Sequence, residues 1–195
     1  MSIIKPLAPP LLLMKDIIRE GAPALHRRVA AVSLPPNEED RQCMQLMMEY
    51  LRNSQDTTVA SRYDLRAGVG MSANQIGLNK RMCAICIQKP ELQVEYELYN
   101  PVLISHSDAM VFLAAGEGCL SVDRYVPGFV PRYEWVKVQA ADAWGTLSEY
   151  TFHDYTSIVV QHELDHLDGV LFYDHISVPN PFQLPDHVSV RPIIM

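Results

Sequence analysis

The segment 161–167 constrains this chain more than any other part of its sequence, because it reads Gln-His-Glu-Leu-Asp-His-Leu and contains the pattern His-Glu-x-x-His. Residues four apart lie on one face of an α-helix, about 6 Å apart along its axis. His162 and His166 can therefore bind one metal ion from the same side. Glu163 is rotated by about 100° from His162, where its carboxylate can accept a proton from water at the metal.

The residues around this motif favour a buried helix. Ile158 and Val159 precede His162 by one turn, so the histidines project from an apolar stripe. Gly169 is a typical residue just past a helix C-terminus. The pattern predicts a helix at 155–168 that carries two ligands of a catalytic metal site.

Such a site needs a third protein ligand. One metalloprotease pattern places a histidine six residues after His166, but Phe172 occupies that position and cannot bind a metal. Another takes a carboxylate from a downstream helix, and Asp186 lies at about the right distance. It follows Leu-Pro, however, which is poor helix sequence. Neither protease pattern fits the chain.

The four cysteines are too few for a disulfide scaffold in 195 residues, so we expect reduced thiols and a cytoplasmic location. Cys83 and Cys86 form a C-x-x-C pair inside a β-type run, where their side chains would point to opposite faces. Cys119 follows Gly118, which permits close approach of the backbone, directly after an apolar strand-like segment. A thiolate there would complete a Cys-His-His set, although a buried structural thiol is the simpler interpretation of this cysteine alone.

The rest of the chain predicts one α+β domain over residues 1–195. Residues 1–36 are irregular and proline-rich, with an apolar run at 11–14 that we assign to the core. Asn37 and three acidic residues begin a helix at 38–53, whose Cys43 and methionines face the core. β-type segments follow at 82–87, 96–105, 110–114, 136–141 and 149–152. Prolines after the second helix exclude a helical tail. We expect antiparallel or mixed sheets packed around the metal-binding helix.

Composition excludes several partners. The chain has 16 basic and 23 acidic residues, a net charge of -7, which disfavours binding to DNA or to RNA in general. No apolar run approaches the roughly 18 residues that a membrane span needs.

Three segments together resemble the peptide deformylase family. Residues 68–75 read Gly-Val-Gly-Met-Ser-Ala-Asn-Gln, similar to the family's GxGxAAxQ; residues 117–121 read Glu-Gly-Cys-Leu-Ser, similar to EGCLS; and residues 161–166 are similar to QHExDH. The likeness spans at least 68–169, and a weaker one covers 16–25. The chain length and the insertion between the first two motifs resemble the longer subclass of Gram-positive bacteria and mycoplasmas.

One motif departs from the family pattern. Ser72 stands where the family has its first alanine, and Asn74 precedes Gln75. A buried serine hydroxyl needs a hydrogen-bond partner, so these departures bear on fine substrate contacts rather than on the reaction.

The resemblance implies a hydrolase that removes the N-formyl group from the N-terminal formyl-methionine of newly synthesised polypeptides and releases formate. It assigns one divalent metal ion to three ligands, namely Cys119, His162 and His166. Water bound to that ion attacks the formyl carbon, and Glu163 acts as general acid and base. The Gln75 side-chain amide and the Leu120 backbone N–H stabilise the oxyanion.

The resemblance also implies a binding surface and partners. The substrate would lie against Gly68, Val69, Gly70, Gly118, Ile158 and Val159. Fe²⁺ is the expected native ion, with Zn²⁺, Ni²⁺ or Co²⁺ as substitutes, although affinity order alone would favour zinc over iron. Partners are N-formylmethionyl nascent peptides, with transient association to the ribosome. Asp165 and Arg132 either brace the metal helix or form an ordinary surface ion pair.

Two other functions compete with this one. The helix motif alone is compatible with a metallo-endopeptidase. A non-catalytic, metal-stabilised binding module is the other alternative, but it would leave Glu163 and Gln75 without a role.

Overall fold

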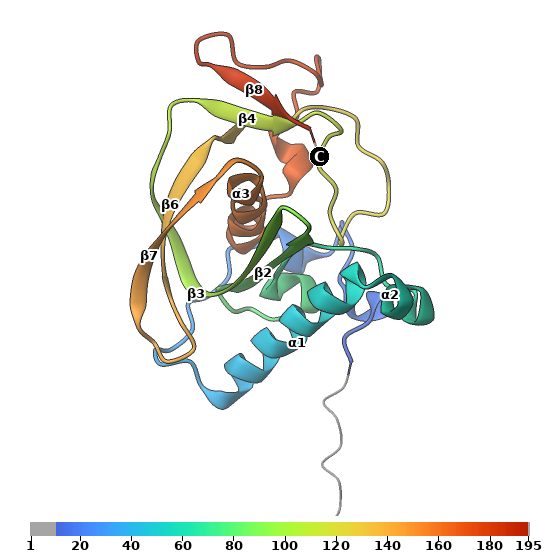
Figure 1. Cartoon of the computed structure of the whole chain (residues 1–195), viewed down its shortest axis with the longest axis vertical. Helices are drawn as coiled ribbons and strands as arrows, with labels where there is room; N and C mark the ends of the chain where they lie inside the picture. The colour runs from blue at the N-terminus through green and yellow to red at the C-terminus, as the bar shows by residue number, and fades with distance from the viewer. Residues whose placement is uncertain (1–10, 195) are drawn as a thin grey trace, which may run out of the picture.

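One helix, α3 (Asp154–Asp168), lies at the centre of the molecule, with the strands of two β-sheets around it (Figure 1). The computed structural model describes residues 11–194. The other α-helices within this range are α1 (Glu38–Gln55) and α2 (Thr57–Tyr63). Short 3-10 helices lie at Met14–Asp16, Pro23–His26, Ala73–Ile76 and Phe172–His175.

The larger sheet has five antiparallel strands in the order β1-β2-β3-β6-β7, which are β1 (Gly70–Ser72), β2 (Met82–Lys89), β3 (Leu92–His106), β6 (Trp135–Ala141) and β7 (Leu147–His153). The smaller sheet has the order β5-β4-β8, which are β5 (Arg132–Tyr133), β4 (Met110–Leu113) and β8 (Val190–Ile193). Strands β4 and β8 pair in parallel. The fold is α+β with mixed sheets, as predicted.

Strand β2 separates two cores. Cys83 and Ile85 pack in the cluster that includes the apolar face of α3, whereas Ala84 and Cys86 pack in the cluster that includes α1. All four are fully buried, because the strand is covered on both faces. Such a strand needs apolar residues at successive positions. The two cysteines therefore point to opposite faces, as predicted.

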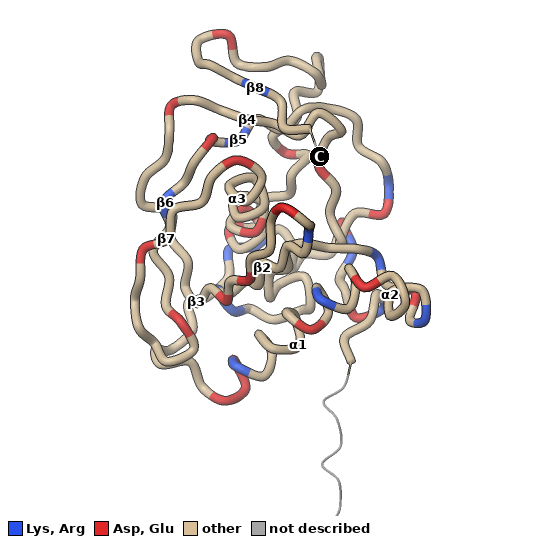
Figure 2. Tube along the Cα trace, in the orientation of Figure 1, with Lys and Arg blue, Asp and Glu red and all other residues tan. Residues whose placement is uncertain are grey.

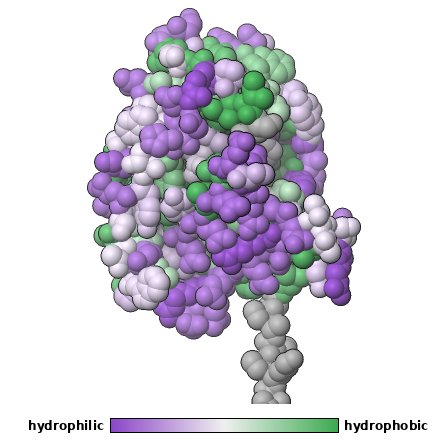
Figure 3. Space-filling view, in the orientation of Figure 1, coloured by the Kyte–Doolittle hydropathy of each residue, from purple (hydrophilic) through white to green (hydrophobic). Residues whose placement is uncertain are grey.

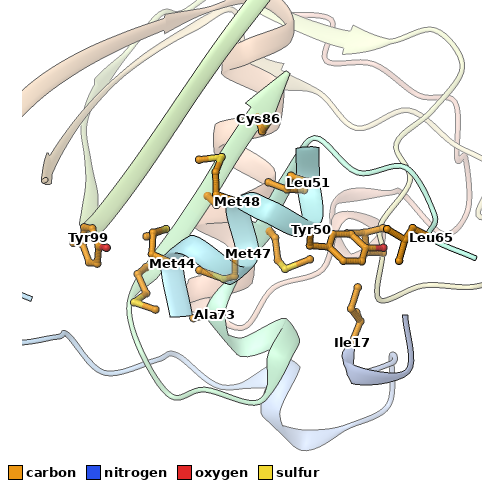
Figure 4. Close-up of a cluster of buried hydrophobic side chains, with 14 of the residues drawn as sticks. Ile17, Met44, Met47, Met48, Tyr50, Leu51, Leu65, Ala73, Cys86 and Tyr99 are labelled. Carbon is orange, nitrogen blue, oxygen red and sulfur yellow. The ribbon is translucent and has the colours of Figure 1, made fainter. Parts of the chain in front are cut away.

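Helix α1 begins where the sequence indicates. The Asn37 side chain accepts a hydrogen bond of 2.8 Å from a backbone N–H of the first turn. The buried face presents Met44, Met47, Met48, Tyr50 and Leu51 to the core (Figure 4). Cys43 is half-buried and packs against the same cluster. The methionine stripe is core, and the helix continues to Gln55.

Helix α3 confirms the helix predicted from the histidine motif. It ends at Asp168 and is followed by Gly169, whose φ of +80° is the left-handed conformation that favours glycine. A Cβ at this position would lie 2.7 Å from the backbone N of Arg27, so packing requires glycine as well. Ile158 and Val159 are buried one turn before His162 and hold this part of the helix against the protein interior.

Several elements were missed by the sequence patterns. Helix α2, strands β1, β5 and β8, and the 3-10 helices were not predicted. The tail is not helical, as expected, but it contributes β8 to the smaller sheet in spite of Pro192. At the other end, Leu12, Leu13 and Met14 pack partly buried against the core beneath α1. The first ten residues of the predicted irregular segment lie outside the described residues.

The surface carries mixed charge. Basic and acidic residues are interspersed along the trace in Figure 2. The face in Figure 3 is hydrophilic over α1, and apolar groups gather on it toward β8. No helix within residues 11–194 is long and apolar enough to cross a membrane.

Candidate active site

The three predicted metal ligands lie together. Cys119 lies in the loop between β4 and β5, and His162 and His166 project from α3. Their ligand atoms all lie within 4.8 Å of one another, and Cys119 Sγ is 3.1 Å from His166 Nε2. Within residues 11–194 no other three His, Cys, Asp or Glu side chains meet in this way, so the C-x-x-C pair and Asp186 are outside the cluster.

The donor set fits a divalent ion. Imidazole nitrogen and thiolate sulfur at about 2.1 and 2.3 Å from one tetrahedral ion would be roughly 3.6 Å apart, which is close to the separations in this cluster. A thiolate with two imidazoles suits zinc and the later first-row metals rather than Mg²⁺ or Ca²⁺. Cys119 and His166 are buried, so a bound ion would be shielded from bulk solvent.

A buried charge network fixes the orientation of His162. Its Nδ1 lies 2.8 Å from Glu117 Oε2, which leaves Nε2 available to the metal. Arg132 donates to both Glu117 oxygens, at 2.8 and 3.0 Å, and to Asp165 Oδ2 at 2.5 Å. Burial would raise the pKa of Glu117, but Arg132 and His162 outweigh that effect and hold the pKa at about 2. The Asp165–Arg132 pair is thus part of a buried network that braces α3, since Arg132 is only 3% exposed.

The Glu163 carboxylate packs against strand β1. Ser72 Oγ donates to its Oε2 at 2.7 Å. At Gly70 a Cβ would lie 2.4 Å from Glu163 Oε1, closer than real atoms approach, so this glycine makes room for the carboxylate. Burial raises the pKa of Glu163 to about 7, against the lowering effects of His162 and Ser72. A carboxyl group that titrates near neutrality suits a general base.

Gln75 and Leu120, the two residues predicted to donate hydrogen bonds to the oxyanion, both lie beside Cys119. The Ser72 backbone N–H donates to Gln75 Oε1 at 2.8 Å, which turns Gln75 Nε2 toward Ser121 Oγ at 3.1 Å and Cys119 Sγ at 3.6 Å. Gln75 is 1% exposed, so its amide is held in place by packing as well. Leu120 follows Cys119 directly and lines the cavity beside it.

A cavity of about 410 Å³ opens beside these groups. All six residues predicted to bind substrate line it, namely Gly68, Val69, Gly70, Gly118, Ile158 and Val159. Gln75, Cys119, Leu120, His162 and Glu163 line it too, whereas His166 is not among the lining residues. A Cβ at Gly118 would meet nothing within 4 Å, which places open space beside this residue.

Both departures from the family motif contact α3. Besides its bond to the carboxylate, Ser72 Oγ lies 2.9 Å from the Glu163 carbonyl oxygen. Asn74 Nδ2 donates to the His166 carbonyl at 2.5 Å. Ser72 and Asn74 are almost fully buried and do not line the cavity, so they tie their segment to the helix that carries His162 and His166. The prediction that these departures bear on substrate contacts was wrong, because both side chains contact α3 instead.

Several cavity residues were missed by sequence reasoning, namely Arg66, Leu113, Glu117, Val122 and Tyr155. Glu117 had a signal, because it opens the same motif as Cys119, and a carboxylate beside a metal-binding histidine is a common partner. Arg66 lies two residues before the first motif. The other three carry no pattern that separates them from ordinary core or loop residues.

The comparisons with known proteins agree with this geometry. The model of the family "Polypeptide deformylase" matches residues 14–181. The chain is 46% identical over 183 residues to the peptide deformylase of Latilactobacillus sakei, covering 92% of this chain and 99% of that one. It is 47% identical over 181 residues to a peptide deformylase of Listeria monocytogenes, with the same coverage. These relatives come from Gram-positive bacteria, as the motif spacing predicted.

Solved structures show the same likeness. The Thermus thermophilus peptide deformylase matches with a TM-score of 0.69 and 29% identity, over 84% of this chain and 86% of that one. The Met-Ala-Ser-bound class I type b peptide deformylase of Acinetobacter baumannii matches with a TM-score of 0.67 and 27% identity, over 85% and 99%. These matches do not favour the metallo-endopeptidase alternative.

The conclusion rests on a His-Glu-x-x-His helix, a cysteine beside both of its histidines, and a family model that covers most of the sequence. This chain belongs to the peptide deformylase family, whose members are metal-dependent hydrolases.

Proposed function

We propose that this protein removes the N-formyl group from N-terminal formyl-methionine, that residues 1–195 form one catalytic domain, and that the cluster on α3 performs the reaction. The observation that carries the proposal is the position of the buried Glu163 carboxylate beside Cys119, His162 and His166, in one cavity of a peptide deformylase family member.

Cys119, His162 and His166 would hold one divalent ion through their sulfur and imidazole nitrogens. When bound, the ion supplies Lewis-acid chemistry, which acidifies water and polarises the formyl oxygen. We propose Fe²⁺ as the native ion, with Zn²⁺, Ni²⁺ and Co²⁺ as substitutes. Glu117 supports this set because its bond to His162 Nδ1 keeps that ring in the tautomer that offers Nε2 to a metal.

Glu163 moves the protons. Its carboxylate accepts a proton from the attacking water and delivers it to the amine that leaves, which would otherwise be too basic to depart. The pKa of about 7 permits both directions of transfer near neutral pH. Ser72 and the space at Gly70 hold the carboxylate in one place during the two steps.

The developing oxyanion needs donors that are already in position. Gln75 Nε2 is one, because the Ser72 backbone N–H fixes the orientation of its amide group. The Leu120 backbone N–H is the other. Glutamine donates a hydrogen bond without adding a positive charge that would repel the metal.

The substrate would lie along the edge strand β1, against the six residues predicted from the family motifs. Ile158 and Val159 offer apolar surface for the methionine side chain, and Val69 lies at the cavity wall. A peptide backbone could add to this edge as a further strand. The missing side chains of Gly68 and Gly70 leave room for Leu120 and Glu163, which border the same cavity. Because the substrate is a nascent chain, we further propose a cytoplasmic location and transient contact with the ribosome, without DNA or membrane binding.

The test is formate release from formyl-Met-Ala-Ser, compared with cleavage of unformylated Met-Ala-Ser, by protein purified without oxygen. We expect formate from the first peptide and no cleavage of either peptide chain. Peptide-bond cleavage without formate would refute the proposal in favour of an endopeptidase. Metal analysis of the same sample, with iron as the expected ion, tests the choice of Fe²⁺.

A further inference from the structure

We propose that Arg66 is a positioning residue for this reaction: it fixes and polarises the peptide group between Cys119 and Leu120, whose N–H is the proposed oxyanion donor. This inference rests on the proposed function. Arg66 lies in the segment before β1 and belongs to none of the three family motifs.

The Cys119 carbonyl oxygen accepts two hydrogen bonds. One comes from the Val122 backbone N–H at 3.1 Å, which closes a turn over residues 119–122. The other comes from Arg66 Nη2, which also donates to the Val122 carbonyl at 3.1 Å. Arg66 Nη2 thus bridges both ends of the turn, while Nη1 remains available to Asp123, and the rigid plane of the guanidinium fixes the two nitrogens relative to one another.

The other end of the same peptide group is free. Among residues 11–194 the Leu120 N–H donates no hydrogen bond, although Leu120 is only 5% exposed. Leu120 lines the cavity beside Cys119 and Glu163. An N–H that has no partner within the protein is available to a reacting oxygen, so its orientation is a feature that the surrounding structure must maintain.

A charged donor on the carbonyl oxygen acts on the amide in two ways. It holds the plane of the peptide group, so the N–H keeps one direction before substrate arrives. It also draws electron density toward the oxygen, which makes the N–H a stronger donor, because linked hydrogen bonds polarise one another. Both effects favour the transition state, in which charge develops on the oxygen, more than the neutral substrate.

Arg66 is itself held in place. The hydroxyl of Tyr50, which is fully buried in the core beneath α1, donates to the Arg66 carbonyl at 3.0 Å. Arg66 Nη1 pairs with Asp123 Oδ1 at 3.1 Å on the exposed side. The core therefore holds the Arg66 backbone beside the turn, whereas the ion pair with Asp123 is exposed to solvent and contributes little to the position of the guanidinium.

The first experiment measures steady-state deformylation of formyl-Met-Ala-Ser by wild type, Arg66→Ala and Arg66→Lys, each with its metal content determined. We expect kcat to fall roughly tenfold in Arg66→Ala with little change in KM, since loss of a whole oxyanion donor costs more. Arg66→Lys should be intermediate. Asp123→Ala is the matched control, because it removes the exposed ion pair but leaves the bonds to the turn, and we expect its kcat to match wild type.

The second experiment reads the amide directly. In zinc-loaded protein, the ¹⁵N and ¹H resonances of the Leu120 amide should move upfield in Arg66→Ala and stay in place in Asp123→Ala. Millimolar guanidinium should restore part of the lost kcat in Arg66→Ala alone. These readouts separate polarisation of the peptide group from a general loss of stability.

Several results would overturn the inference. One is an unchanged kcat in Arg66→Ala. A second is a rise in the KM of this variant alone, which would make Arg66 a substrate contact. A third is a loss of activity in proportion to a loss of metal. An unmoved Leu120 resonance would also contradict it. If wild type itself releases no formate, the proposed function fails instead, so the two failures are distinguishable.

Discussion

Substitution of Gly70 by alanine tests whether the position of the Glu163 carboxylate controls the reaction. The backbone of Gly70 has an ordinary extended conformation that alanine tolerates, so the only cost is steric. Its Cβ would lie 2.4 Å from Glu163 Oε1, 2.8 Å from Cδ and 2.9 Å from Cγ. Ordinary van der Waals contact begins at 3.4 Å, so the carboxylate oxygen must move by 3.4 − 2.4 = 1.0 Å.

A displacement of that size is large for a proton-transfer group, since misplacement by about 1 Å can cost roughly a hundredfold in rate. We therefore expect kcat for formyl-Met-Ala-Ser to fall about a hundredfold in Gly70→Ala, with metal content unchanged because Glu163 is not a ligand. Gly118→Ala is the comparison, because its Cβ would enter open space. As Gly118 lines the cavity, its effect should fall on KM. A kcat for Gly70→Ala within twofold of wild type, with the folded protein intact, would refute the steric argument.

Three further variants, at Ser72, Glu117 and Cys119, test the neighbours of Glu163 and His162. Ser72→Ala removes a buried hydrogen bond to a carboxylate, so it should lower the free energy of unfolding by about 1–2 kcal/mol. Because Ser72 lowers the pKa of Glu163, its loss should also move the acid limb of the kcat/KM profile to higher pH. An acid limb at the wild-type pH would contradict this. Glu117→Gln removes one of the two counter-charges of Arg132 and the carboxylate that orients His162, so metal affinity should fall roughly 10–100-fold in a competition titration. Unchanged affinity would refute the role of Glu117. The pKa of Glu117 is lowered from 4.5 to about 2, so its charged form stabilises the fold above pH 4.5, and this stability is lost as the pH falls from 4.5 toward 2. In urea unfolding, the free energy of unfolding of Glu117→Gln should therefore fall less over this pH range than that of wild type. Cys119→Ala should lose metal occupancy, and full occupancy by metal analysis would exclude the thiolate as a ligand.

The parts of the fold that the sequence predicted are those with a strong local period. Helices α1 and α3 repeat apolar residues at helical spacing and have clear end signals, so both were placed within two residues. Strand β2 was evident as a continuous apolar run. Strands β1, β5 and β8 have two to four residues each, too few for a period, and their pairing depends on distant partners. The parallel pair of β4 and β8 joins segments far apart in the sequence, which no local pattern indicates.

In the candidate site, too, the residues related by local geometry could be predicted from the sequence, and those joined only by the tertiary fold could not. The two histidines and Glu163 follow from helix geometry alone, because residues four apart must share a face. Cys119 is 43 residues before His162, so only a tertiary arrangement or a family resemblance connects them. The partner of Ser72 and the bridge from Arg66 to the turn could not be predicted, because each hydrogen bond joins residues more than 50 positions apart.

The most direct test of the account is formate release from formyl-Met-Ala-Ser by wild type and Glu163→Ala, each shown beforehand to carry one divalent ion per chain. We predict that wild type releases one formate per peptide. The variant, with the same metal content, should turn over slower by at least roughly a thousandfold, because the positioned base is lost while the ligands remain. A variant that deformylates at the wild-type rate would contradict the central claim that the buried Glu163 carboxylate moves the protons of this reaction.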